Sequence, residues 1–584
     1  MKSPKILLIA MPWNRADYPS VQLGLLKSYL IERNVDVTCA YPYLDLENRL
    51  GSELYFRIAN NLHPVLGEAF WSTFLTGTVS DQFIELCLAC GEFSGEEFNF
   101  ILEIMTAYLD KLVSEYDWHS IDVLGFSCTF NQLFASLTLA ERVKRLSPKI
   151  RIIFGGYEVS NERGKLLIDS FPFIDCIVSG PGEAALHHYL QNLPSGKLLI
   201  KDGDYKTSQP GIPDYDEFFE NALVNKNRVI VPLVASSGCD YGQCAFCTQH
   251  ADIKYKTLTS TEIQSAIRTI CTKYNSFNIE FTDTSFPIKL IDEKWDTPEG
   301  VSIFAQIRPM CTSEVFENLK RTGFSGFQIG IEAFNSSMAK KMGKPNGLLQ
   351  NVHCLKLLHE HDIEITYNLI LDFPSFTNED IKQTIETIPL IYHLQPPSNL
   401  LRFNLQLGSK VFNQPNYYNI TNVRPHSNYA ALTPFYENNQ LLPLYYEYDR
   451  LYSLDEDLLS DVDDLCRNWL NIFDVGFPLL TWEMLDSKVT IQDRRFGREV
   501  VRSLEKVDGE ILMRCEYPIK LSALFSLSLV DKSSVETAIQ HLAEFNLIIF
   551  DSDMIISLPV KKTKHKFKKA TQIESYFYRG DNAY

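Results

Sequence analysis

Short β-branched apolar runs alternate with helical stretches along most of this chain, and no other sequence feature restricts its fold so strongly. Parallel strands need crossover connections, usually helices, so this alternation indicates the α/β class. One series fills residues 1–200 and a second fills about 228–435. The apolar runs are 6–10, 35–39, 123–127, 150–154 and 174–179 in the first series, and 229–234, 279–282, 302–306, 326–331, 363–370 and 401–406 in the second.

Each series predicts a separate domain. The first is interrupted by an aromatic-rich helical insert at about 46–115 and predicts a doubly wound parallel sheet. The second has six strands, most of them followed by a helix, and predicts a partial (βα)6 barrel whose active site faces the carboxyl ends of the strands. More than one domain is expected in any case, because 584 residues exceed the roughly 250–300 that one core serves.

The remaining segments are predicted to connect and extend these domains. Residues 201–227 are polar and turn-rich, as in a linker. From about 436 an acidic helical segment, two further helices and an apolar hairpin follow, so residues 436–584 predict a helical, winged-helix-like domain. Its basic tail begins with six lysines within Lys561–Lys569, which are read as a solvated tail or as a docking site for an acidic leader peptide.

Charge and composition exclude several classes of protein. A net charge of −18 argues against a general nucleic-acid binder, since phosphate binding needs a basic surface. No stretch approaches the roughly 18 apolar residues of a membrane span. The short apolar run near the N-terminus ends at Pro12 and predicts a buried strand rather than a signal peptide. Thirteen unevenly spaced cysteines are not a secreted disulfide framework. We expect a cytoplasmic protein with no nucleic-acid or membrane partner.

Three cysteines stand in one short loop, SSGCDYGQCAFCTQH, directly after the first predicted barrel strand. Cys239, Cys244 and Cys247 can bind three irons of a 4Fe–4S cube, which leaves the fourth iron open to substrate. Zinc is the alternative ligand, with His250 completing four donors, and three buried structural thiols are the third. Zinc sites usually come as separated pairs in small modules, so a strand-to-helix loop favours the cube.

Small residues follow three strands of the first series, in the turns Ser127-Cys128-Thr129, Gly155-Gly156 and Gly180-Pro181-Gly182-Glu183. In open α/β sheets ligands bind at the carboxyl ends of the strands, where glycine lets the backbone approach closely. Glycines also turn a chain with no ligand present. Three such turns at one edge favour a large ligand there.

The cysteine loop resembles that of the radical S-adenosylmethionine (SAM) enzymes, whose usual motif is C-x3-C-x2-C with an aromatic residue before the last cysteine. This chain has C-x4-C-x2-C, with Phe246 in the aromatic place. The resemblance implies that SAM chelates the open iron and is split to a 5′-deoxyadenosyl radical. The positions it implies for SAM binding, each of which could also be a cap or a solvated polar residue, are Phe246, Asp283, Thr284, Gln306, Arg308, Glu332 and Asn368.

The first domain resembles the cobalamin-binding domain that precedes many such barrels, and is closest to the radical SAM C-methyltransferases that mature ribosomally made peptides. Segments such as MPWNRADYPSVQLGLLKSYL, GFQIGIEAF and HLQPPSNLLRF carry this likeness over about 1–435. The D-x-H-x-x-G motif for a histidine below cobalt is absent. The implied cobalamin contacts are Pro12, Trp13, Ser127, Thr129, Asn131, Gly155, Gly156, Tyr157, Glu158, Gly180, Gly182 and Glu183.

The resemblance implies a function. The enzyme would use methylcobalamin to methylate an unactivated sp³ carbon of a ribosomally made peptide or natural product, consuming two SAM per methyl. Its partners would be that substrate, in some cases a precursor peptide with a leader, and an electron donor such as flavodoxin or ferredoxin. The alternatives are radical chemistry without methyl transfer (ring contraction, epimerisation or cross-linking) and a non-catalytic peptide-binding relic. Cys87 and Cys90 are read as core thiols rather than an auxiliary cluster.

Overall fold

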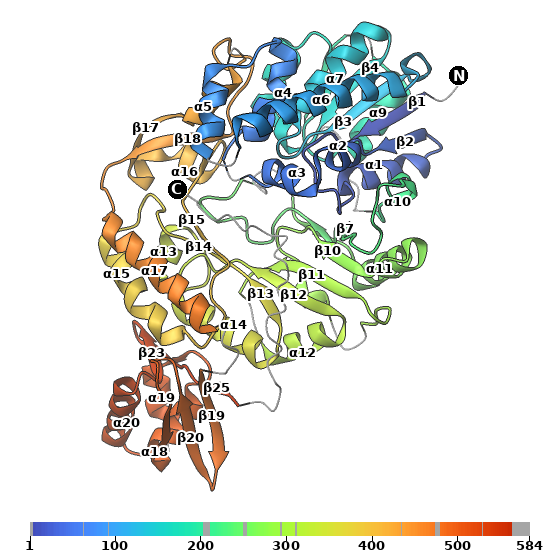
Figure 1. Ribbon diagram of the computed structural model, residues 1–584. Helices are drawn as coiled ribbons and strands as arrows, with labels where there is room; N and C mark the ends of the chain where they lie inside the picture. The colour runs from blue at the N-terminus through green and yellow to red at the C-terminus, as the bar shows by residue number, and fades with distance from the viewer. Residues whose placement is uncertain are drawn as a thin grey trace.

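The computed structural model describes residues 4–61, 63–90, 93–194, 196–201, 211–248, 254–291, 295–309, 312–433, 435–473, 479–527 and 530–562. An N-terminal sheet domain, a barrel and a C-terminal module follow one another from the top to the bottom of Figure 1. Within the described segments no helix is both long and apolar enough to cross a membrane.

The N-terminal domain is the doubly wound parallel sheet that the alternation predicts. Its strand order is β2-β1-β3-β4-β5-β6, and every neighbouring pair is parallel. The third strand is buried along its whole length, as its continuous apolar run requires. The strands are β1 (Lys5–Ile9), β2 (Asp36–Ala40), β3 (Val123–Ser127), β4 (Arg151–Gly155), β5 (Cys176–Val178) and β6 (Leu198–Ile200). The short edge strand β6, which borders a polar stretch, is not among the predicted strands.

Helices cover this sheet and form the predicted insert. The covering helices are α1 (Val21–Ile31), α7 (Leu133–Leu146), α8 (Asn161–Ser170) and α9 (Glu183–Asn192). The insert consists of α2 (Tyr43–Leu50), α3 (Ser52–Ala59), α4 (Leu66–Thr76), α5 (Asp81–Cys90) and α6 (Gly95–Glu115). A capping box between Ser94 and Glu97 starts the longest of these helices. Cys87 is buried in this insert, and burial raises the pKa of its thiol to about 12.

The barrel is partial, and its sheet is divided. Parallel strands β7 (Val231–Leu233), β10 (Asn278–Phe281), β11 (Ser302–Ile307), β12 (Phe324–Ile329) and β13 (Glu364–Thr366) form the order β13-β12-β11-β10-β7. A separate parallel pair, β14 (Asn368–Ile370) and β15 (Asn399–Leu401), joins this sheet through a bridge between Glu332 and Leu369. The covering helices are α11 (Ser260–Tyr274), α12 (Ser313–Arg321), α14 (Leu348–Glu360) and α15 (Asn378–Thr387).

Two predicted strands differ from the structure. The run 363–370 is split at Tyr367, whose buried ring directs its hydroxyl to the Gln395 carbonyl at 2.7 Å. The run 401–406 is split as well, because the Phe403 N–H donates to the Asp372 carboxylate between the two halves. Its second half, β16 (Leu405–Gln406), pairs antiparallel with β18 (Tyr445–Arg450), which also pairs with β17 (Ile420–Pro425).

The acidic helix α17 (Glu456–Phe473) lies beside α15 of the barrel and precedes the C-terminal module (Figure 1). Two helices and a hairpin follow in the order that the sequence predicts: α19 (Leu521–Leu527), α20 (Lys532–Glu544), β23 (Ile548–Asp551) and β24 (Met554–Ser557). The module also contains a sheet that was not predicted, ordered β21-β20-β19-β25 from Val500–Ser503, Lys488–Asp493, Leu480–Leu485 and Val560–Lys561, together with α18 (Lys506–Arg514) and β22 (Ile519–Lys520). The lysine run beyond residue 562 lies outside the described residues.

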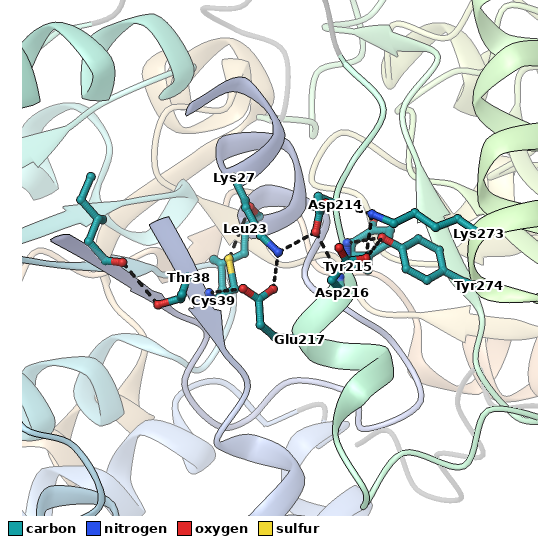
Figure 2. Close-up of polar contacts among 11 residues, drawn as sticks. Leu23, Lys27, Thr38, Cys39, Asp214, Tyr215, Asp216, Glu217, Lys273 and Tyr274 are labelled. Carbon is teal, nitrogen blue, oxygen red and sulfur yellow. Dashed lines mark hydrogen bonds and ion pairs between the residues drawn. The ribbon is translucent and has the colours of Figure 1, made fainter. Parts of the chain in front are cut away.

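The part of residues 201–227 that the structure describes is not a solvated connection. Asp214 and Glu217 accept hydrogen bonds from Lys27 of α1 at 2.6 and 2.5 Å, and Asp214 also binds Lys273 of α11 at 3.0 Å. Figure 2 shows the segment between the two domains, with Lys27 on one side and Lys273 on the other. Lys27 is 5% exposed, and Tyr215 between the acidic residues is fully buried. We call Lys27, Asp214, Asp216, Glu217 and Lys273 the clamp.

Candidate cluster and cofactor site

The three cysteines lie on a loop that the barrel holds from two sides. The Ala245 N–H donates to the Met342 carbonyl at 2.9 Å, and the Tyr241 hydroxyl donates to the Gly343 carbonyl at 2.7 Å. Gly343 has φ +70°, and a Cβ there would lie 2.7 Å from the Gln243 carbonyl oxygen. Cys239, Cys244 and Cys247 are all partly buried. The loop is therefore fixed in place by backbone contacts.

Asp283, predicted to contact SAM, lies below this loop. One oxygen accepts from the Ala235 N–H at 3.0 Å and the other from the Ser236 hydroxyl at 2.5 Å. The side chain is 2% exposed, and burial raises its pKa to about 6. Both oxygens are thus engaged by the strand that leads into the cysteine loop. This geometry makes Asp283 a support for the loop.

Two more predicted residues end the third barrel strand. Gln306 is the last but one residue of β11, and its carbonyl accepts from the Phe286 N–H at 2.7 Å. Arg308 forms an ion pair with Asp240, inside the cysteine loop, and its guanidinium lies 5.5 Å from the centre of the Tyr241 ring. An arginine that contacts the loop next to Cys239 can position the cluster or a ligand carboxylate.

Glu332 and Asn368 lie side by side across the division of the barrel sheet. The Glu332 N–H donates to the Asn368 carbonyl at 3.1 Å, and Glu332 has φ +63°. The Glu332 carboxylate lies 3.5 Å from the ammonium of Lys344, which in turn is 5.9 Å from the Phe246 ring centre. The positive charge of Lys344 also lowers the pKa of the Cys244 thiol, against a larger rise from burial. Glu332, Lys344 and Phe246 therefore gather beside the cluster loop.

The other predicted SAM residue, Thr284, follows Asp283 on a partly buried bend. His250, the fourth donor that zinc would need, lies outside the described residues. In the part of the chain that the structure covers, no three His, Cys, Asp or Glu side chains are arranged around one ion. A cube needs no such convergence, because each thiolate binds a different iron. Three thiols on one rigid loop fit that cluster.

The turn after β4 links the N-terminal sheet to the cysteine loop. Gly156 has φ +102°, and a Cβ there would lie 2.3 Å from the Cys128 carbonyl oxygen, so only glycine fits. The next residue, Tyr157, shares a 2.8 Å hydrogen bond between its hydroxyl and that of Thr248, directly after Cys247. Thr248 in turn donates to Gln406 at 3.1 Å. The edge predicted for cobalamin thus contacts the loop predicted for the cluster.

Several predicted cobalamin residues surround an apolar slot of about 50 Å³ at this edge. Gly155, Gly182 and Ser127 line it together with leucines of β1 and α1. Gly125 also lines it, and a Cβ on Gly125 would lie 2.6 Å from Leu8 Cδ2. The walls of the slot are apolar, and its volume is only about 50 Å³. It can therefore take only a thin apolar group.

Other predicted cobalamin residues hold the edge itself. Trp13 is 4% exposed, packs 5.3 Å from the Tyr55 ring and donates to the Gly67 carbonyl at 2.9 Å, so it anchors the helical insert. Thr129 donates its hydroxyl hydrogen to Gln132 at 2.6 Å. Gly180 has φ +96°, and Glu183 begins α9, where burial raises its pKa. Pro12 precedes Trp13 at the end of the first strand.

A cavity of about 350 Å³ lies between the N-terminal domain and the barrel, and we call it the interdomain cavity. Its polar lining includes Asn61, Glu68, Asn131, Glu158, Arg163 and Gln406. Its apolar walls come from Phe130, Phe134, Leu441 and Leu444, among others. Because Gln406 accepts the hydrogen bond from Thr248, a single side chain separates this cavity from the cysteine loop.

Sequence reasoning identified Asn131 and Glu158 but missed the residues that complete this cavity. Arg163 lies 3.0 Å from Glu158 in an ion pair whose side chains are 5% and 8% exposed. Glu68 accepts the N–H groups of Leu133 and Phe134 at 2.9 and 2.8 Å, at the start of α7. A lone acid inside the apolar run VLGEAFW was the signal for Glu68. Arg163 stands in an ordinary polar helix and gives no such signal.

Comparisons with known proteins identify both halves of this site. The radical SAM superfamily model matches residues 233–388, and the B12 binding domain model matches residues 89–190. A search of curated proteins finds no match. The first of these ranges contains the cysteine loop, and the second contains the turns after β3 and β4.

Solved structures share the fold. The radical SAM methyltransferase TsrM from Kitasatospora setae, with tryptophan substrate and a SAM analogue bound, is 13% identical with a TM-score of 0.53, over 79% of this chain and 89% of that one. Its structure with cobalamin and a [4Fe–4S] cluster is 12% identical, also at 0.53, over 79% and 91%. The cobalamin-dependent radical enzyme OxsB, with aqua-cobalamin and SAM bound, is 14% identical with a TM-score of 0.47, over 93% and 71%.

These identities are low, so the structural likeness concerns the fold, while the two family matches identify the domains. A radical SAM domain implies a 4Fe–4S cluster and SAM, and a B12 binding domain implies cobalamin. The cysteine loop and the turns of the sheet edge lie within these two matches. The chain contains a radical SAM domain and a B12-binding domain.

Proposed function

We propose that this enzyme uses methylcobalamin to methylate an unactivated sp³ carbon of a ribosomally made peptide or natural product. The observation that carries the proposal is the Tyr157–Thr248 hydrogen bond of 2.8 Å, which joins the edge of the B12 domain to the residue after Cys247. A methyl carrier and a radical source must reach the same carbon, so they must lie side by side. TsrM, which shares the fold, is itself a methyltransferase.

The chain's own residues have distinct tasks in this proposal. Cys239, Cys244 and Cys247 would hold three irons, and Asp283 keeps their loop in place through Ala235 and Ser236. When bound, the cluster and SAM supply a 5′-deoxyadenosyl radical, and cobalamin supplies the methyl group. Glu332 and Lys344 present opposite charges beside Phe246, where the amino and carboxylate groups of SAM need partners.

Cobalamin would bind across the sheet edge. The apolar slot lies at this edge, but its volume of about 50 Å³ is smaller than the roughly 150 Å³ that takes up benzene, so the slot would need to widen to hold the base that ends the nucleotide tail of cobalamin. The sequence holds no D-x-H-x-x-G motif to supply a histidine for cobalt. Of the histidines before residue 201, His63 lines the interdomain cavity. We expect cob(II)alamin in the enzyme to show no nitrogen superhyperfine splitting in its electron paramagnetic resonance spectrum. Splitting that disappears in His63→Ala would contradict that expectation.

Product analysis tests the function directly. Reduced enzyme with SAM and its substrate should make 5′-deoxyadenosine and S-adenosylhomocysteine in about equal amounts, and methyl-labelled SAM should label the product. Deoxyadenosine alone would indicate radical chemistry without methyl transfer, and S-adenosylhomocysteine alone would indicate polar methylation. Cys247→Ala should lose the iron and both products, whereas Cys87→Ser, in the core of the helical insert, should keep them.

A further inference from the structure

Arg163 is buried beside the interdomain cavity with much of its hydrogen-bonding capacity unused. It is 4% exposed and lines the cavity. Its Nη2 donates to Glu158 at 3.0 Å. Among the residues that the structure describes, neither its Nε nor its Nη1 has a hydrogen-bond partner. Buried donors without acceptors are rare, because each costs about 1–3 kcal/mol.

The side-chain amide of Asn61 is a second buried donor in the same cavity. Asn61 lines the cavity, and its orientation is set by the His63 N–H, which donates to Asn61 Oδ1 at 2.9 Å. The amide nitrogen Nδ2 therefore remains as a donor, and it is buried without a partner in the described part of the chain. Two elements far apart in the sequence thus contribute unused donors to one space, and a ligand there must bring acceptors.

The charges around Arg163 decide which acceptor fits. Glu158 pairs with Arg163 directly, and Glu68 lines the same cavity at 5% exposure. Whether Glu68 is protonated or ionised, these three side chains together carry no net positive charge. A ligand carboxylate or phosphate would therefore add an uncompensated negative charge to a buried site, which is costly. A neutral carbonyl oxygen satisfies the same donors without that cost.

We propose that Arg163 and Asn61 form a recognition site for neutral carboxamide groups. Their donors would bind amide carbonyl oxygens, and the apolar walls around Phe130, Phe134 and Leu441 would contact the carbon skeleton that bears them. Two sources of this chemistry rest on the proposed function: the amide side chains at the rim of cobalamin, and the backbone amides of a peptide substrate. The unused donors themselves do not depend on it.

Binding measurements test this site without relying on catalysis. The variants are Arg163→Lys, which keeps the charge next to Glu158 but loses the fork of donors, and Asn61→Asp, which replaces a donor with an acceptor. Arg145→Lys is the matched control, since this exposed arginine of α7 pairs with Glu141 and does not line the cavity. The first arm titrates hydroxocobalamin into each cobalamin-free protein and follows its absorbance.

The second arm uses protein already loaded with cobalamin. It compares N-acetylphenylalaninamide, a neutral diamide, with N-acetylphenylalanine, which carries a carboxylate, by calorimetry. We expect Arg163→Lys to weaken binding about tenfold in one arm, since a hydrogen bond to a charged donor contributes about 1.5 kcal/mol or more. Asn61→Asp should weaken the same arm, and Arg145→Lys should leave both within about twofold.

The pattern of results identifies the source or rejects the site. A loss in the hydroxocobalamin arm assigns the site to the corrin amides, and a loss confined to the diamide arm assigns it to a peptide. Unchanged binding in both arms for both variants would overturn the proposal, and so would tighter binding of the carboxylate than of the diamide. An enzyme that passes these tests yet makes no methylated product would refute the proposed function alone.

Discussion

A buried arginine lies at each of the two interfaces of the barrel. Arg163 lies at the interface with the N-terminal domain, and Arg495 lies at the interface with the C-terminal module. Arg495 is 2% exposed, and its guanidinium donates to both Asp493 oxygens and to the carbonyls of Leu390 and Asn546, at 2.6–3.0 Å. Arg163 makes one such contact, to Glu158. All three nitrogens of the Arg495 guanidinium donate to protein acceptors, whereas Arg163 borders a cavity with donors to spare.

The same contrast extends to neighbouring groups. At the C-terminal interface Lys356 of α14 donates to Ser557, and His393 Nε2 donates to the Leu558 carbonyl at 2.8 Å, while His393 Nδ1 is buried with no partner among the described residues. At the N-terminal interface Asn61 has an unused amide beside the cavity, counting partners within the described residues. A buried cation whose donors are all satisfied by protein serves to join elements. Unused donors that gather at a cavity indicate a ligand, and the difference between the two interfaces separates structural from binding roles.

The largest effect that we predict is at the C-terminal interface. Arg495→Met should lower the free energy of unfolding by about 3–5 kcal/mol, because it leaves the Asp493 carboxylate buried without its partner. Urea denaturation followed by circular dichroism measures this. Arg498→Met, an exposed arginine on the same turn, should change it by no more than about 0.5 kcal/mol. Equal effects of the two substitutions would remove the distinction between the interfaces.

The second prediction concerns pH at that interface. Burial lowers the pKa of Lys356 from 10.5 to about 8. Between these values the unfolded chain binds more protons than the folded chain, so this lysine makes stability rise with pH, by about 3 kcal/mol in total. Lys356→Met should remove that rise between pH 8 and 10, whereas the exposed Lys382→Met should keep it. A wild-type protein whose stability is flat over this window would refute the prediction.

At the interdomain cavity we expect the opposite dependence, with stability falling as pH rises. Burial, helped by the charge of Glu158, raises the pKa of Glu68 from 4.5 to about 8. Over that interval the folded chain binds more protons than the unfolded chain, so this group makes stability fall as pH rises. Glu68→Gln should flatten the pH dependence of thermal unfolding from pH 5 to 8. Glu96→Gln, on an exposed helix start, is the control.

The smallest effect should come from the contact between sheet edge and cysteine loop. Tyr157→Phe removes one hydrogen bond and should cost about 1 kcal/mol, whereas Thr248→Val removes this bond and the one to Gln406 and should cost about 2 kcal/mol. Because both changes remove the same bond, the double variant should cost less than the sum of the two. A double-mutant cycle on the unfolding free energy measures this coupling, which we expect at about 0.5–1.5 kcal/mol. Strict additivity would mean that the contact does not join the domains.

Local patterns predicted the strands, the helical insert and the cysteine loop, since apolar period and spacing are properties of neighbouring residues. They also located Glu158 and Asn131 by the turns after β3 and β4. They did not predict Arg163 and Asn61 as partners in one cavity, because about a hundred residues separate them and only the packed sheet brings them together. The division of the barrel sheet was missed for a similar reason: the Phe403–Asp372 contact that bends the chain depends on the assembled fold.

The clamp described above determines how the two domains can be exchanged between proteins. Family matches delimit a B12 domain and a radical SAM domain as separate pieces, which invites recombination between them. Lys27 is 5% exposed and depends on Asp214 and Glu217, and all three residues lie outside both matched ranges. A chimera cut at residue 200 would inherit a buried lysine without its carboxylates, at a cost of about 3–5 kcal/mol. The piece to be exchanged is therefore the sheet domain together with the segment that contains Asp214 and Glu217.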